Sequence, residues 1–258
     1  MSRVVGVISG KGGVGKSVVA INTAAALHKY YGKKVLLVDC NITTSHIGLY
    51  LGLYSTPVTL NDALKGHIDI EKTIYEHPSG INVIPASLRL EDLRNVDWHM
   101  VREKLLGILD NYDFILLDSS PGFNRESLIT LEASHEALMV TAPLVPTVAD
   151  LIKCRQLCEE LHVKPLGVVL NKVRNKKYEL SKQEVEQMTE MSVIASIPYY
   201  ETVMESTITK TPAINISRKI GSHFKDISEF LIDEKISEDK GLVKQLKKLF
   251  RLPSKQSI

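Results

Sequence analysis

The sequence contains only three cysteines, Cys40, Cys154 and Cys158, and no C-x-x-C pair. An odd count without paired spacing argues against a disulfide framework and against a cysteine-ligated metal site. We therefore expect the protein to work in a reducing interior. Because Cys154 and Cys158 are four residues apart in an expected helix, they share one face of it, and we interpret them as packing residues.

Two further absences limit the class of protein. No apolar run approaches the roughly 20 residues that a transmembrane helix needs, and no secretory signal precedes the first expected strand, so a cytoplasmic location is expected. The charge is nearly balanced, since 32 Lys and Arg face 30 Asp and Glu, for a net charge of +2. Any attraction to nucleic acid or to a membrane must therefore be local.

The 258 residues alternate between apolar runs and helical patterns. Near-continuous apolar runs are typical of parallel strands that are buried on both faces. The sequence thus predicts an α/β fold, a single doubly wound domain (1–233) with a mostly parallel central sheet flanked by helices, followed by a polar linker (234–239) and a tail (240–258). The expected strands are Val4–Ser9, Val35–Asp39, Ile81–Pro85, Phe114–Asp118, Ala137–Thr141, Leu166–Asn171 and Val193–Pro198, and the expected helices are about 18–31, 99–110, 146–162, 181–189 and 213–232.

The strongest motif is a phosphate-binding loop from Gly10 to Ser17, placed between the first strand and the first helix. Glycines let backbone N–H groups curl around phosphate oxygens, and the helix start adds its dipole. Lys16 is expected to reach the β- and γ-phosphates, and the Ser17 hydroxyl to ligate Mg²⁺. Lys11 has no role in the ordinary motif. The alternative is a glycine-rich turn without a ligand. The expected loop contacts to ATP are Gly12, Gly13, Val14, Gly15, Lys16, Ser17 and Val18.

Two aspartates stand at the carboxyl ends of expected strands, where ligands bind in open α/β sheets. If both strands flank the loop strand, Asp39 and Asp118 face the Mg²⁺ position together. We expect Asp118 to be the Walker B carboxylate and Asp39 to hold a metal-bound water or the network of the attacking water. The alternative is that each caps a loop or a helix. The segment 119–122 suits a switch loop or an ordinary turn.

Together these segments resemble the MinD branch of the MinD/ParA ATPases, which carry a deviant Walker A motif, and switch I is most similar to archaeal members. The resemblance rests on Lys11–Ser17 as signature loop, 39–49 as switch I, 118–122 as switch II, and 167–172 with 197–198 beside adenine. It implies a homodimer that sandwiches two Mg-ATP, with Lys11 crossing to the partner's nucleotide. It also implies that Asn171 bonds adenine, with a strand-end turn as alternative, and that Pro198 and Tyr199 line the base.

One position departs from the family pattern. MinD proteins with well-known hydrolysis carry an aspartate two residues beyond the position of Asp39, and this chain has Asn41 there. An amide orients a water but cannot accept its proton. We therefore predict slow ATP turnover, which Asn41→Asp should accelerate. His46, also in switch I, is interpreted as a solvated loop residue, with the dimer interface as its alternative place.

Residues 240–252 form a basic amphipathic pattern that is typical of an in-plane membrane anchor. Lysine and arginine occupy the opposite arc, so an anionic membrane surface is the expected partner. The alternatives are packing on the domain itself, a disordered basic tail, or binding in a protein groove. The expected membrane-facing residues are Leu242, Val243, Leu246, Leu249 and Phe250.

The sequence therefore favours a MinD-like ATPase that cycles between the cytoplasm and the inner face of the cell membrane. It would position division or another assembly, with an activator or cargo protein that the sequence does not identify. A ParA-type DNA-partitioning ATPase is less favoured, because the basic excess lies in the tail and makes nucleic acid an unlikely partner. An iron–sulfur scaffold ATPase of the Mrp type would need a C-x-x-C pair. A nucleotide-gated adaptor with very slow hydrolysis remains open.

Overall fold

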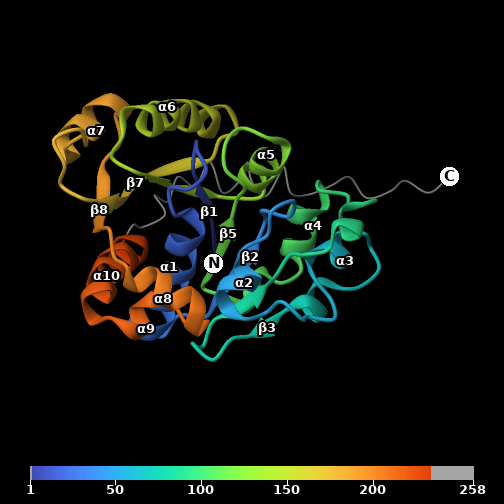
Figure 1. Cartoon of the computed structure of the whole chain (residues 1–258). Coiled ribbons are helices and arrows are strands. Elements are labelled where there is room, and N and C mark those ends of the chain that lie inside the picture. Colours follow the sequence, from blue (N-terminus) through green and yellow to red (C-terminus); the bar gives the residue numbers. More distant parts are fainter. Residues whose placement is uncertain (1, 234–258) are drawn as a thin grey trace.

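The computed structural model describes residues 2–233 as one eight-stranded sheet with helices on both faces (Figure 1). The strand order is β3-β4-β2-β5-β1-β6-β7-β8, and every neighbouring pair is parallel except β3 with β4. The predicted fold class is confirmed, whereas the linker and tail, 234–258, lie outside the described residues. The strands are β1 (Arg3–Ile8), β2 (Val35–Asp39), β3 (Tyr75–Glu76), β4 (Asn82–Ile84), β5 (Phe114–Asp118), β6 (Glu136–Thr141), β7 (Lys164–Val173) and β8 (Val193–Pro198).

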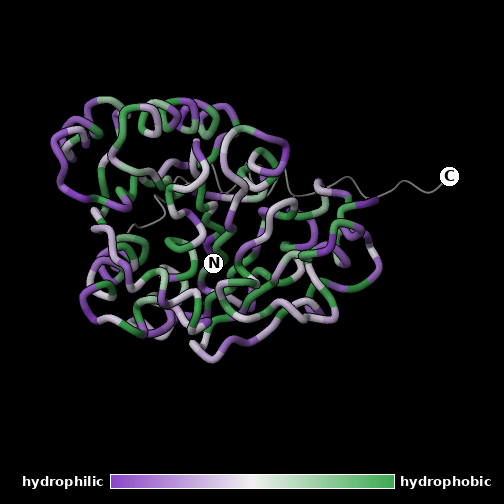
Figure 2. The backbone as a smooth tube through the Cα atoms, in the orientation of Figure 1, coloured by the Kyte–Doolittle hydropathy of each residue, from purple (hydrophilic) through white to green (hydrophobic). Residues whose placement is uncertain are grey.

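Burial explains why the central strands read as apolar runs. Every residue of β1, β2, β5 and β6 is buried, because helices cover both faces of the sheet there. Figure 2 shows these strands as hydrophobic segments inside a more polar shell. Successive side chains alternate between the faces, so Val5 and Val7 enter one core cluster while Val4 enters another.

The helices form the two outer layers. The α1 helix packs with α9 and α10 on one face, and α3, α4 and α5 lie on the other. The α6 and α7 helices pack near β6, β7 and β8. The helices are α1 (Lys16–Tyr31), α2 (Ile47–Leu51), α3 (Leu60–Leu64), α4 (Met100–Leu106), α5 (Arg125–Glu132), α6 (Val145–Glu160), α7 (Lys182–Thr189), α8 (Thr202–Thr209), α9 (Ala213–Ile216) and α10 (Arg218–Asp233), with short 3₁₀ turns at Ile70–Thr73, Leu90–Leu93 and Leu109–Asn111.

Several short elements differ from the sequence prediction. The helix expected over 213–232 is two helices, because the chain is extended at Ser217, and the helix expected over 99–110 ends at Leu106. The sequence did not predict β3, α2, α3, α5 or α8. The four missed helices have five to eight residues, so each shows about two turns of an apolar period at most, which is a weak signal.

The amino edge of the sheet is tied to the last described helix by Arg3. Its guanidinium pairs with Glu136 at 2.7 Å, donates to the carbonyl oxygen of Leu231 in α10, and lies over the ring of Phe114. Arg3 and Glu136 are both buried. The start of β1 and the end of α10 therefore meet at the edge of the sheet opposite the phosphate-binding loop. Within residues 2–233, no helix has the length and apolar character to cross a bilayer.

The three cysteines are free and buried. Cys154 and Cys158 pack in the core beneath α6, as the sequence predicted, and burial raises the pKa of both thiols to about 12. Neither is poised to react at neutral pH.

Candidate functional site

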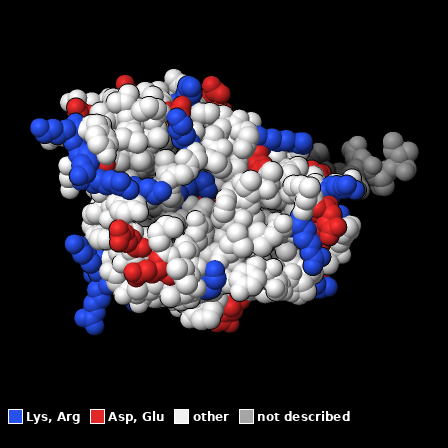
Figure 3. Space-filling model, in the orientation of Figure 1, with Lys and Arg blue, Asp and Glu red and all other residues white. Residues whose placement is uncertain are grey.

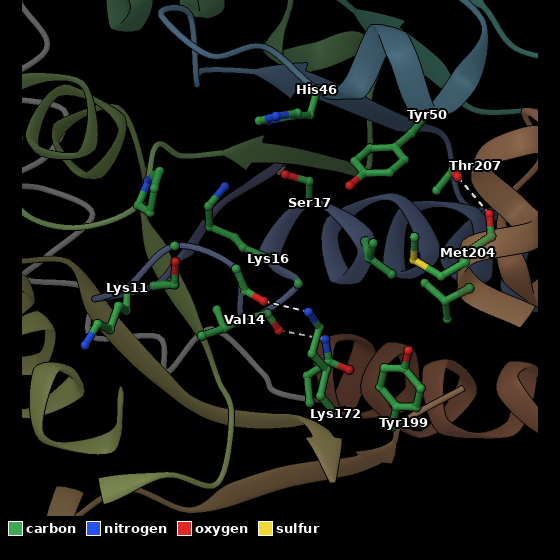
Figure 4. Close-up of a pocket in the computed structure, with 18 of the residues that line it drawn as sticks. Lys11, Val14, Lys16, Ser17, His46, Tyr50, Lys172, Tyr199, Met204 and Thr207 are labelled. Atoms are coloured by element: carbon green, nitrogen blue, oxygen red, sulfur yellow. Dashed lines mark hydrogen bonds between the residues drawn. The ribbon is translucent and has the colours of Figure 1, made fainter. Parts of the chain in front are cut away.

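A cavity of about 610 Å³ opens at the carboxyl edge of the sheet (Figure 4). The phosphate-binding loop forms its floor, and switch I, the end of β7 and the start of α8 form its walls. Asp39 and Asp118 lie below the lining. The residues predicted to contact ATP all line it, together with Lys11 and Asn41: Gly12, Gly13, Val14, Gly15, Lys16, Ser17, Val18, Asn171, Pro198 and Tyr199.

The loop is shaped by glycines that no other residue could replace without strain. Gly13 and Gly15 have φ of 82° and 91°, in the left-handed region. A Cβ on Gly15 would stand 2.3 Å from Nδ2 of Asn171, and one on Gly10 would stand 2.4 Å from Cβ of Asp150. The backbone is therefore held in a cradle at the start of α1, where N–H groups and the helix dipole favour an anion.

Lys16 and Asp118 form a buried ion pair behind the cradle, with Nζ and Oδ1 2.6 Å apart. The other carboxylate oxygen, Oδ2, is buried and has no hydrogen-bond partner within residues 2–233. β5 lies directly beside β1, so Asp118 comes next to the loop strand. An unpartnered carboxylate oxygen behind the phosphate cradle fits a hard cation such as Mg²⁺. The described chain has no group of three His, Cys, Asp or Glu that could hold a metal by itself, so phosphate oxygens or water must complete the coordination.

Asp39 is arranged differently from the expectation. β2 lies beyond β5 instead of beside β1, so the two aspartate strands do not flank the loop strand. Both Asp39 oxygens are occupied, by the Ser45 hydroxyl at 2.7 Å and by backbone N–H groups of Asn41, His46 and Ile47 at 3.1–3.2 Å. Asp39 therefore caps switch I and α2, and its expected role toward a metal-bound water stays a prediction. Burial, with the charge of Asp118, raises the pKa of Asp39 to about 7.

The side chain of Asn41 folds back on switch I. Its Nδ2 donates to the Thr44 carbonyl oxygen at 2.7 Å, and its Oδ1 accepts from the Thr44 hydroxyl at 2.9 Å. Thr43 at the tip of the loop donates to Glu126 in α5. Both polar atoms of the Asn41 amide are thus used within the loop, although the residue lines the cavity.

The expected switch II segment lies beside the phosphate-binding loop. The backbone N–H of Gly122 donates to the Ser9 carbonyl oxygen at 2.9 Å, and Pro121 lines the cavity. The Gly122 N–H must leave Ser9 before it can bind a phosphate.

Two side chains at the end of β7 form hydrogen bonds with the phosphate-binding loop. Asn171 donates from Nδ2 to the Val14 carbonyl oxygen at 2.9 Å, and Lys172 donates from Nζ to the Gly13 carbonyl oxygen at 2.6 Å. Figure 4 shows these contacts as dashed lines next to Tyr199. Oδ1 of Asn171 has no hydrogen-bond partner within residues 2–233, so it is free to accept from a base.

The sequence analysis missed several lining residues, among them Tyr50 from α2 and Val203, Met204 and Thr207 from α8. No motif marks them, because short helices bring them to the cavity only in the folded chain. His46 is exposed, as expected of a solvated residue, but it also lines the mouth of the cavity.

Comparison with known proteins shows which family the chain is similar to. The family model CobQ/CobB/MinD/ParA nucleotide binding domain matches residues 5–213. An uncharacterized ATP-binding protein of Methanocaldococcus jannaschii is 34% identical over 214 residues, 83% of this chain and 81% of the relative. The septum site-determining protein MinD of Thermotoga maritima is 26% identical over 267 residues, 97% of this chain and 98% of the relative.

Two solved structures match the fold over most of its length. The cell division ATPase MinD of Pyrococcus furiosus gives a TM-score of 0.86 at 29% identity and covers 90% of this chain and 98% of its own. MinD of Pyrococcus horikoshii, complexed with Mg-ADP, gives 0.86 at 27% identity and covers 91% and 97%. With the glycine cradle and the Lys16–Asp118 pair at the sheet edge, these matches establish that the chain belongs to the CobQ/CobB/MinD/ParA family, as a P-loop ATPase of the MinD/ParA type.

Proposed function

We propose that the protein binds Mg-ATP, closes into a nucleotide-sandwich dimer and associates reversibly with the membrane to position division or another assembly. This proposal rests mainly on the preformed phosphate cradle and its two lysines. Lys16 points into the cradle, and Lys11 lies outside it. Lys16 is buried and paired, whereas Lys11 is exposed and makes no ion pair in the described part of the chain. Figure 4 shows the Lys11 side chain pointing away from Lys16.

The residues that would hold Mg-ATP follow from this geometry. ATP with Mg²⁺ supplies the reactive phosphoanhydride and the cation. Lys16 would exchange its bond to Asp118 for the β- and γ-phosphates, and Oδ1 of Asp118 would become free beside the Ser17 hydroxyl to orient metal-bound water. Asp39 would hold switch I in place through its four hydrogen bonds, and Oδ1 of Asn171 would accept from the base. The Mg-ADP complex of the Pyrococcus horikoshii relative supports the choice of ligand.

The surface around the cavity supports a dimer. Large apolar side chains are exposed in segments that follow the carboxyl ends of five different strands, and Figure 3 shows the central part of this face as largely uncharged. Two such faces can approach without charge repulsion, and Lys11 of each copy would offset the negative charge of the other's phosphates. The apolar side chains are Leu49, Leu90, Phe123, Val145, Met204 and Ile208.

Light scattering after size exclusion tests the dimer. The wild type should be monomeric without nucleotide and with Mg-ADP, and dimeric with Mg-ATP. Lys11→Glu should remain monomeric with Mg-ATP while it still binds nucleotide. Lys176→Glu, which reverses a lysine outside the cavity lining, is the matched control and should dimerise. Dimerisation of Lys11→Glu with Mg-ATP would refute the role of Lys11 in trans.

Membrane association would depend on the tail, whose residues 240–258 lie outside the described part. Each basic residue near an anionic surface contributes about 1 kcal/mol, so one short tail binds weakly. A dimer tethers two tails, and the second then binds at a high effective concentration. Vesicle sedimentation should therefore show stronger binding with a non-hydrolysable ATP analogue than with ADP. Equal binding would refute the coupling.

A nucleotide-gated adaptor with very slow hydrolysis is the second candidate, favoured by the hydrogen bonds that Asn41 makes with Thr44. A DNA-partitioning activity is the third. Lys172 lies near the end of β7, and Arg174, Lys176 and Lys177 follow on the connection to α7, where Figure 3 shows a row of basic side chains. A salt-sensitive gel shift with double-stranded DNA distinguishes the third candidate.

A further inference from the structure

One wall of the cavity is built by an aromatic residue that belongs to no nucleotide-binding motif. Tyr50 lies in α2, the helix whose first residues form the end of switch I. Its ring is partly buried against the core cluster beneath α1, and its residue lines the cavity. Figure 4 shows its hydroxyl directed into the cavity, toward the side where Ser17 lies.

The hydroxyl of Tyr50 has no hydrogen-bond partner within residues 2–233, whereas the hydroxyls of Tyr75, Tyr112 and Tyr200 are all bonded. Burial, followed by the charge of Asp118, raises the pKa of Tyr50, so the group is a neutral donor at physiological pH. A donor without a partner that faces a cavity is a group available to a ligand.

The position of Tyr50 in the cavity determines which part of a bound nucleotide it can contact. The phosphate cradle, Gly13–Ser17, forms the floor of the cavity, and Asn171, which donates to Val14 of the cradle, lies with Tyr199 on the side where the base is expected. Tyr50 lies across the cavity from Tyr199, on the same side as Thr207 of α8, and its hydroxyl is directed toward Ser17 (Figure 4). We therefore expect the ribose and the α-phosphate, which join the base to the terminal phosphates, to pass close to Tyr50.

We propose that the Tyr50 hydroxyl donates a hydrogen bond to the ribose–α-phosphate section of the nucleotide and so ties switch I to nucleotide occupancy. This inference rests on the proposed binding of ATP. The section is common to ATP and ADP, so the contact reports that the site is filled and does not distinguish the two.

The contact would reach switch I through short connections. Tyr50 is three residues from Ile47, whose N–H is held by Asp39, and the Tyr50 N–H donates to the His46 carbonyl oxygen at 3.0 Å. A ligand that fixes the Tyr50 ring therefore fixes the first turn of α2 and, through Asp39, the end of the loop. Switch I would then be ordered before the terminal phosphate makes any contact.

Calorimetric titration of Tyr50→Phe tests the contact, because this change removes the hydroxyl and keeps the ring. We expect Kd for Mg-ATP and for Mg-ADP to rise by the same factor, about 3- to 10-fold, which is the usual effect of one hydrogen bond. Tyr54→Phe is the matched control, since Tyr54 follows the same helix, is 57% exposed and lies outside the lining. Its Kd values should equal those of the wild type.

Two further experiments distinguish the possible outcomes. With 2′-deoxy-ATP, loss of the difference between Tyr50→Phe and wild type would assign the acceptor to the 2′ hydroxyl, and persistence would assign it to the rest of the section. Hydrogen exchange should show that Mg-ADP protects the amides of 45–51 in the wild type and protects them less in Tyr50→Phe. Unchanged Kd values in Tyr50→Phe, or a loss for ATP alone, would overturn the inference. Failure of the wild type to bind either nucleotide would instead refute the proposed function.

Discussion

Replacement of Asn41 by aspartate perturbs switch I in two opposite ways. In the structure, Nδ2 of Asn41 donates to the Thr44 carbonyl oxygen at 2.7 Å. A carboxylate oxygen at that place cannot donate, so two acceptors would face each other. The new charge would also stand near Asp39, whose Oδ1 accepts from the Asn41 N–H at 3.1 Å. Asn41→Asp should therefore loosen the nucleotide-free loop, although a carboxylate suits the orientation of an attacking water.

The cost to the free protein follows from the contacts. Loss of one hydrogen bond costs about 1 kcal/mol, and placing a carboxylate at the buried position 41, beside Asp39, adds about 1–2 kcal/mol. We expect the free energy of unfolding without nucleotide to fall by about 2–3 kcal/mol. Thr44→Val, which removes only the hydroxyl bond to Oδ1 of Asn41, should cost about 1 kcal/mol and serves as the control.

Single-turnover hydrolysis measures the expected increase in the rate of ATP hydrolysis. With enzyme in excess over Mg-ATP, the wild type should turn over slowly and Asn41→Asp at least about 10-fold faster, within the range for a well-placed acid–base group. Thr44→Val keeps the amide at position 41 and should remain within about 3-fold of the wild type. Equal or lower rates in Asn41→Asp, at saturating Mg-ATP and with a confirmed fold, would refute the role assigned to this position.

Three further predictions test separate parts of the structure. Gly15→Ala should abolish ATP binding by calorimetry, because its Cβ would meet Asn171, whereas Gly66→Ala, with φ of 75° and nothing within 4 Å, imposes only backbone strain and should bind ATP normally. Deletion of 240–258 should abolish vesicle sedimentation and leave ATP affinity unchanged. Arg3→Met should lower the free energy of unfolding in urea by about 3–5 kcal/mol, because it leaves the buried Glu136 carboxylate without its partner; a loss below 1 kcal/mol would contradict this account.

The sequence predicted the central sheet because a strand that is buried on both faces appears in the sequence as a continuous apolar run. β2 and β5 begin and end at the residues expected, since uninterrupted apolar runs end at an aspartate in both. The phosphate-binding loop was equally visible, because its backbone demands glycine at fixed positions such as Gly13 and Gly15. Both features are local, so a single sequence carries them.

The rest of the site depends on contacts between distant segments. The order of the strands places β5 between β1 and β2, and no local pattern shows that Asp39 is one strand further from the loop than Asp118. Tyr50 and Met204 reach the cavity from helices of five and eight residues, too short for periodicity to identify. The bond between Asn41 and Thr44 depends on how the loop folds, which composition does not determine.

The hydrogen bond from Arg3 to α10 holds the end of α10 at the edge of the sheet opposite the nucleotide site. β1 carries Arg3 at its first residue and leads into the phosphate-binding loop at its last, and six residues of strand span roughly 20 Å. The chain leaves α10 at Asp233, close to Arg3, so a ligand in the cradle cannot touch the root of the segment that follows. In the proposed cycle, we expect ATP to act on that segment through dimerisation and not by contact. Membrane binding would thus depend on whether the protein is a monomer or a dimer. Any artificial dimeriser should then replace ATP in recruiting the protein to lipid.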